Sequence, residues 1–137
     1  LSRLASWLKP GGRLLVEIGS TLPALSSHPA TARSMITLTE VLRRRVGTDP
    51  AWARTFPVPL EQAGLVECGA EGRILPARGG GPLAGWLKET TKLVELDAVT
   101  SGIVTQDELD EAYAQYDDPG FVDYTWMTVA AWGRRPQ

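Results

Sequence analysis

A short apolar run that follows a proline–glycine turn constrains the fold of this chain more than any other feature. The run extends from Arg13 to Ile18, directly after Pro10-Gly11-Gly12. Such a run, bounded by a strong turn signal, is typical of a strand covered on both faces, as in a parallel sheet. Residues 2–8 have apolar positions at helical spacing, and a helix there ends before the proline. The chain therefore begins with a helix, a turn and a strand.

The remaining segments alternate between helical and extended patterns. We expect helices where apolar residues recur at helical spacing, and strands where branched and aromatic residues gather. The expected helices cover residues 32–46, 59–64, 83–99 and 106–116, and the expected strands cover residues 65–75 and 124–133. Thr105 and Glu108 have the spacing of a capping box for the last of these helices. Residues 19–31 are rich in Ser, Thr and Pro and predict a loop. This alternation indicates an α/β fold.

Three glycines and one basic run have a more local meaning. Gly47 is expected to end the helix before it. Gly69 and Gly72, within an expected strand, predict a bulge or a close backbone approach. Residues 43–45 are all arginine and lie in the last turn of a helix, where they complement the helix dipole or bind an anion.

The composition excludes several classes of protein. The chain has 137 residues, 43% of them hydrophobic and 22% charged, which fits one globular domain over residues 1–137. A net charge of -2 gives no electrostatic footprint for nucleic acid. No apolar run has the length of a membrane span. Cys68, the single cysteine, makes no internal disulfide and no zinc site alone, so we expect a core position, no metal and a cytoplasmic location.

Three stretches of the sequence resemble class I S-adenosylmethionine-dependent methyltransferases of the actinobacterial small-molecule type. Residues 7–16, Trp-Leu-Lys-Pro-Gly-Gly-Arg-Leu-Leu-Val, resemble the turn and fifth strand of that family. Residues 60–66, Leu-Glu-Gln-Ala-Gly-Leu-Val, resemble the step into its sixth strand. Residues 129–136, Val-Ala-Ala-Trp-Gly-Arg-Arg-Pro, resemble its seventh strand and chain end. In this order the three stretches extend along the whole chain.

The resemblance implies the C-terminal part of a Rossmann-like methyltransferase sheet. In the family, the seventh strand runs antiparallel between the fifth and the sixth. Residues 124–133 would then pair both with the run from Arg13 to Ile18 and with residues 66–75. Residues 82–123 would form an inserted helical lid over the substrate. The full-length parent would use S-adenosylmethionine to methylate a small molecule, and the identity of the acceptor and of its methylated atom stays open.

The family holds its cofactor with a glycine-rich turn after the first strand and an acidic residue after the second, much as dinucleotide folds do. The sequence contains neither feature, so we expect no cofactor-binding residue here and no activity of these residues alone. Leu1 lies inside an expected helix, so we also expect a fragment or a processed product. A strand cut from its neighbour leaves an open edge, and the chain is expected to self-associate through the edge from Arg13 to Ile18.

The candidate site residues lie on the substrate side. Gly19 and Ser20 follow the first strand, at the carboxyl end where open α/β sheets bind ligands. Glu17 would orient a substrate hydroxyl or amine, or cap a neighbouring helix. His28 is the only ready base near neutral pH, or else an exposed loop residue. Four aromatic residues either line an apolar pocket or belong to the core. These are Trp86, Tyr113, Tyr116 and Trp126.

Two other classes of function stay open. The first is a non-catalytic binding or dimerisation domain that keeps the back half of the fold. The second is a nucleotide-dependent oxidoreductase with a similar sheet, although its fingerprint is also missing from these residues. A glycine-rich turn encoded before Leu1 would favour an enzyme, whereas a start site near Leu1 would favour a binding domain.

Overall fold

The computed structural model describes residues 1–137 and contains a three-stranded sheet and several helices. The elements are, in chain order, α1 (Ser2–Trp7), β1 (Arg13–Thr21), η1 (Pro23–Leu25), α2 (Pro29–Val46), η2 (Pro50–Thr55), α3 (Val58–Gln62), β2 (Val66–Arg78), α4 (Pro82–Lys92), α5 (Glu95–Thr100), α6 (Gln106–Asp117) and β3 (Val122–Arg134). The mixture of helices and strands confirms the expected α/β class.

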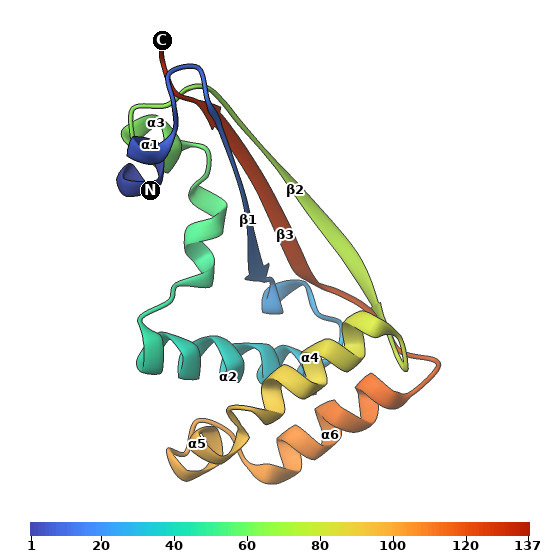
Figure 1. The fold of residues 1–137 in the computed structure, drawn as a ribbon. Helices are drawn as coiled ribbons and strands as arrows, with labels where there is room; N and C mark the ends of the chain where they lie inside the picture. Colours follow the sequence, from blue (N-terminus) through green and yellow to red (C-terminus); the bar gives the residue numbers. More distant parts are fainter. The chain divides into compact units, whose positions relative to one another are not determined.

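The last strand of the chain lies in the middle of the sheet. The order is β1–β3–β2, and β3 runs antiparallel to both of its neighbours (Figure 1). Arg135 donates its backbone N–H to the carbonyl of Gly12 at 2.8 Å, and Leu22 donates to the carbonyl of Thr125 at 2.7 Å. The two contacts are the same number of residues apart on each strand, so β1 and β3 pair in one register. The expected pairing of the last strand with both others is confirmed.

The expectation that the first strand is covered on both faces is wrong for this chain. Arg13, Leu15 and Glu17 are exposed, while the residues between them are half buried. The cause is the antiparallel sheet, which can leave one face to solvent, and the alternate residues of β1 lie on that face. The strand is also longer than expected, because it continues to Thr21.

The chain divides into two compact units. Unit 1 comprises Leu1–Ser20, Pro50–Arg73 and Thr128–Gln137, and unit 2 comprises Thr21–Asp49 and Ile74–Met127. Residues 82–123, the expected lid, do not form a unit of their own, because they belong to unit 2 together with α2.

Unit 1 contains α1, η2, α3 and the segments of the sheet that accompany them. Val129 and Ala131 are buried, whereas Trp132 on the alternate face is 39% exposed. In the register set by the Gly12–Arg135 and Leu22–Thr125 bonds, Leu15 lies opposite Trp132. A Cβ atom added at Gly69 would lie 2.6 Å from the Trp132 ring, which confirms a close approach at this expected glycine position. This face of the sheet in unit 1 is therefore open and carries apolar side chains.

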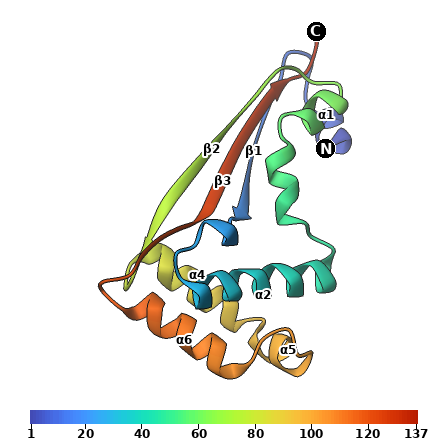
Figure 2. The same cartoon turned by 180° about the vertical axis from the view of Figure 1, so that it is seen from behind.

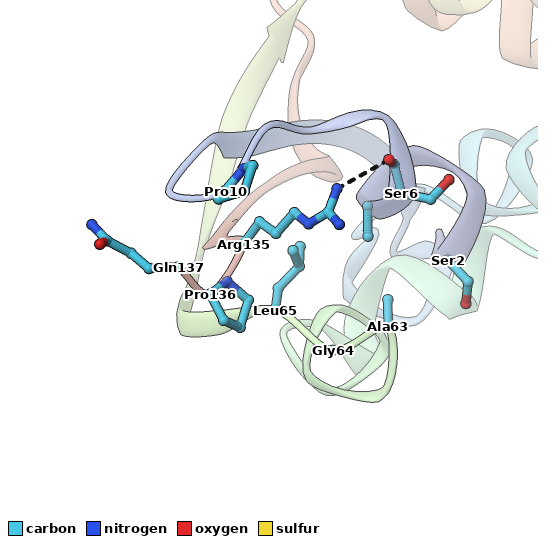
Figure 3. Close-up of a pocket in the computed structure, with 10 residues that line it drawn as sticks. Ser2, Ser6, Pro10, Ala63, Gly64, Leu65, Arg135, Pro136 and Gln137 are labelled. Carbon is cyan, nitrogen blue, oxygen red and sulfur yellow. Dashed lines mark hydrogen bonds between the residues drawn. The ribbon is translucent and has the colours of Figure 1, made fainter.

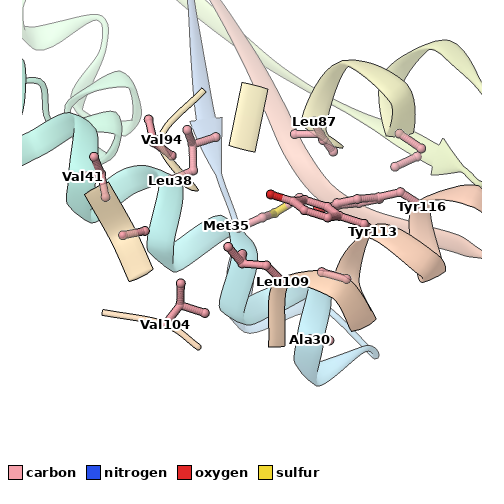
Figure 4. Close-up of a cluster of buried hydrophobic side chains, with 14 of the residues drawn as sticks. Ala30, Met35, Leu38, Val41, Leu87, Val94, Val104, Leu109, Tyr113 and Tyr116 are labelled. Atoms are coloured by element: carbon pink, nitrogen blue, oxygen red, sulfur yellow. The ribbon is translucent and has the colours of Figure 1, made fainter. Parts of the chain in front are cut away.

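Unit 2 is a helical cluster in which α2, α4, α5 and α6 pack together. Both views show α4 and α6 side by side (Figures 1 and 2). Its core contains Met35, Leu38, Leu87, Leu109 and Tyr116, none of them more than 3% exposed (Figure 4). The apolar periodicity of the expected helices therefore marks the faces that meet in this core.

Two expected elements in unit 2 are wrong in detail. The loop over residues 19–31 contains the end of β1, the η1 turn and the first turn of α2, which begins at Pro29 because proline suits the first helical position. The helix over residues 83–99 is two helices, α4 and α5. The chain turns between them at Leu93 and Val94, so that Val94 is buried and Leu93 is 79% exposed.

Candidate functional site

The carboxyl end of β1 carries one unsatisfied buried hydroxyl. Ser20 is fully buried, and its Oγ has no hydrogen-bond partner. An unmade hydrogen bond of this kind costs about 1–3 kcal/mol, so each instance asks for an explanation such as water or a ligand. Gly19 beside it is half buried. These two residues retain the position that the sequence assigned to them, at the carboxyl end of the strand.

The helix-capping role expected for Glu17 is wrong for this chain. Its side chain is exposed and takes part in no ion pair. It caps no helix, because no backbone N–H at a helix N-terminus donates to its carboxylate. Its alternation with Arg13 and Leu15 places it on the open face of β1.

His28 lies at the N-terminal boundary of α2 rather than in an open loop. Its ring centroid is 4.8 Å from that of Phe121, and the residue is half buried. Its backbone N–H donates to Ser26 Oγ at 3.1 Å, and Ser26 Oγ in turn contacts the Asp123 carboxylate. No side-chain group orients the imidazole, which a general base normally requires. The structure thus gives His28 a packing contact and no catalytic partner.

Tyr113 and Tyr116 are core residues with their hydroxyls satisfied. Tyr116 Oη lies 3.0 Å from Ser34 Oγ, and Tyr113 donates to Glu95 Oε2 at 2.7 Å. Burial is the main cause that raises the pKa of Tyr116 to about 12. Burial first, and then Glu95, also raise the pKa of Tyr113. Both side chains hold their protons at neutral pH. Of the two expected roles, lining a pocket or belonging to the core, the structure gives both tyrosines a place in the core of unit 2.

Trp86 and Trp126 form the remaining aromatic candidates. Their ring centroids are 4.8 Å apart at an interplanar angle of 70°, an edge-to-face contact between α4 and β3 within unit 2. Trp86 is 47% exposed, which leaves part of an indole face open to solvent. Of the four aromatic candidates, this pair alone offers an accessible apolar surface.

A hollow of about 430 Å³ in unit 1 was not expected from the sequence (Figure 3). It lies between α1, the turn after α3 and the end of the chain, on the side where β1 begins. The Arg135 guanidinium reaches into this region, but it donates to the backbone carbonyls of Ser6, at 3.1 Å, and Leu8. Ligands of open α/β sheets bind at the carboxyl ends of the strands, which is the other end of β1. No pattern in the sequence signals this hollow.

Acidic, histidine and cysteine side chains do not gather into a cation site. No group of three or more of them could hold a metal ion. Cys68 is half buried, and burial raises the pKa of its thiol, so it stays protonated at neutral pH. Its Sγ packs where a Cβ at Gly133 would come within 2.9 Å, which agrees with the role of a small packed residue.

None of the helices combines the length and the hydropathy that a membrane crossing requires. A scan against models of known protein families found no match to the chain. A search of curated proteins likewise found no match. The candidate site is therefore defined by geometry and by the resemblance of the three sequence stretches alone.

Proposed function

We propose that this chain is the C-terminal part of a class I S-adenosylmethionine-dependent methyltransferase that acts on a small molecule. The observation that carries the proposal is the strand order β1–β3–β2, with the last strand antiparallel between two strands that run in one direction. The same order is implied by the resemblance to that family, which is strongest at the turn Leu8-Lys9-Pro10-Gly11-Gly12 and the strand that follows it. The sequence resemblance and the strand order both support the proposal.

The open face of the sheet in unit 1 supports this proposal. Leu15, 68% exposed, lies opposite Trp132, 39% exposed, on neighbouring strands. Rossmann-like sheets carry helices on both faces, because both faces are apolar. In the proposed parent, helices from the other half of the domain would cover Leu15 and Trp132. An exposed apolar pair at this position is what a part of such a sheet would present.

The residues of this chain do not form a cradle for the cofactor. A glycine-rich turn would have to follow a strand and open a helix, with room for a ligand against its backbone. The glycines at 79–81 do follow β2 and open α4, but Gly79 packs against Asp118, where an added Cβ would lie 1.7 Å from the carbonyl oxygen, so no room for a ligand is left there. Gly11 and Gly12 lie in a turn that leads into β1. In the proposal, the cofactor binds to residues of the parent other than these, and the 137 residues alone are inactive.

The part proposed for this chain is to hold the methyl acceptor. The Ser20 hydroxyl, buried without a partner at the end of β1, is the polar candidate for an acceptor contact. Separately, the Trp86–Trp126 pair in unit 2 is the apolar candidate, within the segment 82–123 and the strand that follows it. Methyl transfer needs alignment and exclusion of water, and each of these contacts, taken by itself, is a candidate for one of those two needs. A cytoplasmic location, in keeping with the free Cys68, is part of the proposal.

Calorimetric titration of the full-length gene product with S-adenosylmethionine tests the assignment. Binding by the full-length protein, and none by residues 1–137, is the expected result. A folded full-length protein that releases no heat of binding and transfers no labelled methyl group would contradict it. A gene that starts near Leu1, without a strand and glycine-rich turn before it, would favour the binding or dimerisation domain instead.

A further inference from the structure

The outer edge of β1 presents backbone groups that no strand pairs with. In the order β1–β3–β2, only β3 bonds to β1. Gly12 and Leu22 both face β3, through the bonds to Arg135 and Thr125. Successive residues of a strand direct their N–H and C=O groups to opposite edges. Arg13, Leu15 and Glu17 therefore direct theirs to the open edge.

The side chains of the same three residues are free as well. Leu15 is 68% exposed, and Arg13 and Glu17 are also exposed. Neither charged residue takes part in an ion pair. Arg13 acts only at longer range on Glu67, whose pKa is lowered mainly by Arg134. The edge thus carries a basic, an apolar and an acidic side chain at alternate positions, all on one face.

We propose that two copies of this chain pair antiparallel through β1, about a two-fold axis at Leu15. In that arrangement, Leu15 faces Leu15 of the second copy, and Arg13 of each copy faces Glu17 of the other. All of these residues direct their backbone groups to the open edge, so each facing pair exchanges its N–H···O=C bonds. The interface is isologous, as a two-fold axis requires.

The pattern of charges selects this register over the alternatives. A parallel pairing in register would place Arg13 opposite Arg13 and Glu17 opposite Glu17, which is destabilising. A shift by two residues would place a charged side chain opposite Leu15 and lose both ion pairs. The chosen register also extends the open face, because Leu15 lies opposite Trp132 on its inner side. The joined sheets then carry a continuous apolar stripe of two tryptophans and two leucines.

The outer edge of β2 is a poorer candidate for the same pairing. It contains Gly69, Gly72 and Pro76 within Val66–Arg78. Glycine weakens a strand and proline cannot donate to a ladder, so this edge offers fewer contacts to a second copy. Glu71 is exposed on β2, so reversing its charge serves as the matched control for reversing a charge on β1.

The test measures the mass of the 137-residue chain by sedimentation equilibrium, in the wild type and in E17R, R13E, R13E/E17R and E71R, with circular dichroism to confirm folding. The wild type is expected to be a dimer. E17R creates two like-charge pairs and is expected to raise the dissociation constant about tenfold or more. The double variant restores opposite charges and is expected to return to within about threefold of the wild type. E71R is expected to leave the dimer unchanged.

A monomeric wild type at every concentration overturns the proposal, and so does a dimer that E17R leaves intact. A double variant that dimerises no better than E17R overturns the register at Leu15. If E71R dissociates the dimer and E17R does not, the contact lies on β2 and the proposal is also overturned. Because no cofactor takes part, the result is independent of the cofactor titration that tests the proposed function.

Discussion

The hydroxyl of Tyr116 on α6 and that of Ser34 on α2 lie 3.0 Å apart in the core of unit 2. Ser34 Oγ also donates to the carbonyl of Thr31 at 2.9 Å. A serine hydroxyl has one hydrogen, so Tyr116 is the donor in its contact with Ser34. The bond joins two helices through a fully buried polar pair, which fixes how the two helices pack.

Removing this donor should measurably weaken the fold. Y116F keeps the ring in the core and deletes one buried hydrogen bond, which we expect to lower the free energy of unfolding by about 1 kcal/mol. Y124F is the matched control, because Tyr124 is 51% exposed, and a change within about 0.5 kcal/mol is expected there. Urea denaturation of both variants is the measurement. Equal effects of the two substitutions would mean that the Tyr116–Ser34 bond contributes nothing.

The same tyrosines predict a loss of stability in alkali. Burial raises the pKa of Tyr116 to about 12, and burial followed by Glu95 raises that of Tyr113. The folded state holds these protons more tightly, so the contribution is complete below the unfolded pKa of about 10 and is lost as the pH rises through the folded values. Unfolding free energies between about pH 9 and 11.5 should fall more steeply in the wild type than in Y113F/Y116F. Parallel curves for the two proteins would contradict this explanation.

Several features of the fold could be predicted because local residues determine them. The turn at Pro10–Gly12 starts β1, Gly47 ends α2 in a left-handed conformation with φ 69°, and Thr105 begins α6. Each depends on the intrinsic geometry of one or two residues. The order of the strands followed from the resemblance, since local patterns contain no information on which strand lies in the middle.

The features that were wrong depend on neighbours that the sequence does not reveal. The apolar run of β1 was expected to be covered on both faces, yet Leu15 is exposed because it lies on a face of the antiparallel sheet that is open to solvent. Helical periodicity placed Tyr116 on an apolar face but could not distinguish a core from a pocket. It also ran through Leu93 and Val94, where burial of Val94 coincides with the turn between α4 and α5. The orphaned hydroxyl of Ser20 has no signal in the sequence.

The capping box at the start of α6 predicts a specific loss on truncation. Glu108 donates its backbone N–H to Thr105 Oγ1 at 3.3 Å, and Thr105 donates its own backbone N–H to Glu108 Oε2 at 2.8 Å. T105A removes the side-chain acceptor and should lower the free energy of unfolding by about 1 kcal/mol at neutral pH. T105S keeps the hydroxyl and should remain close to the wild type. If T105S loses as much as T105A, the hydroxyl is not the cause.

The carboxylate of the same box should make stability depend on acid. The Thr105 backbone bond is the largest cause that lowers the pKa of Glu108, and Arg33 adds to it from 3.6 Å. A lowered pKa gives stability that is present above the unfolded value of about 4.3 and is lost as the pH falls through the folded value. E108Q should make the free energy of unfolding less dependent on pH in this range. D107N, in the same helical turn, should leave the pH dependence close to that of the wild type, and a flattening in D107N as well would point to the helix dipole instead.

Two glycines of unit 2 should respond in opposite directions to one substitution. A Cβ at Gly79 would lie 1.7 Å from the carbonyl oxygen of Asp118, so the backbone must shift and G79A should cost about 2–3 kcal/mol. A Cβ at Gly85 would meet nothing within 4 Å, and the residue lies inside α4. G85A should therefore stabilise the chain by about 1 kcal/mol, because alanine favours the helix. Both substitutions restrict the unfolded chain alike, so the difference between their denaturation midpoints isolates the folded state. Equal denaturation midpoints for G79A and G85A would mean that the close contact between Gly79 and the Asp118 carbonyl does not destabilise G79A.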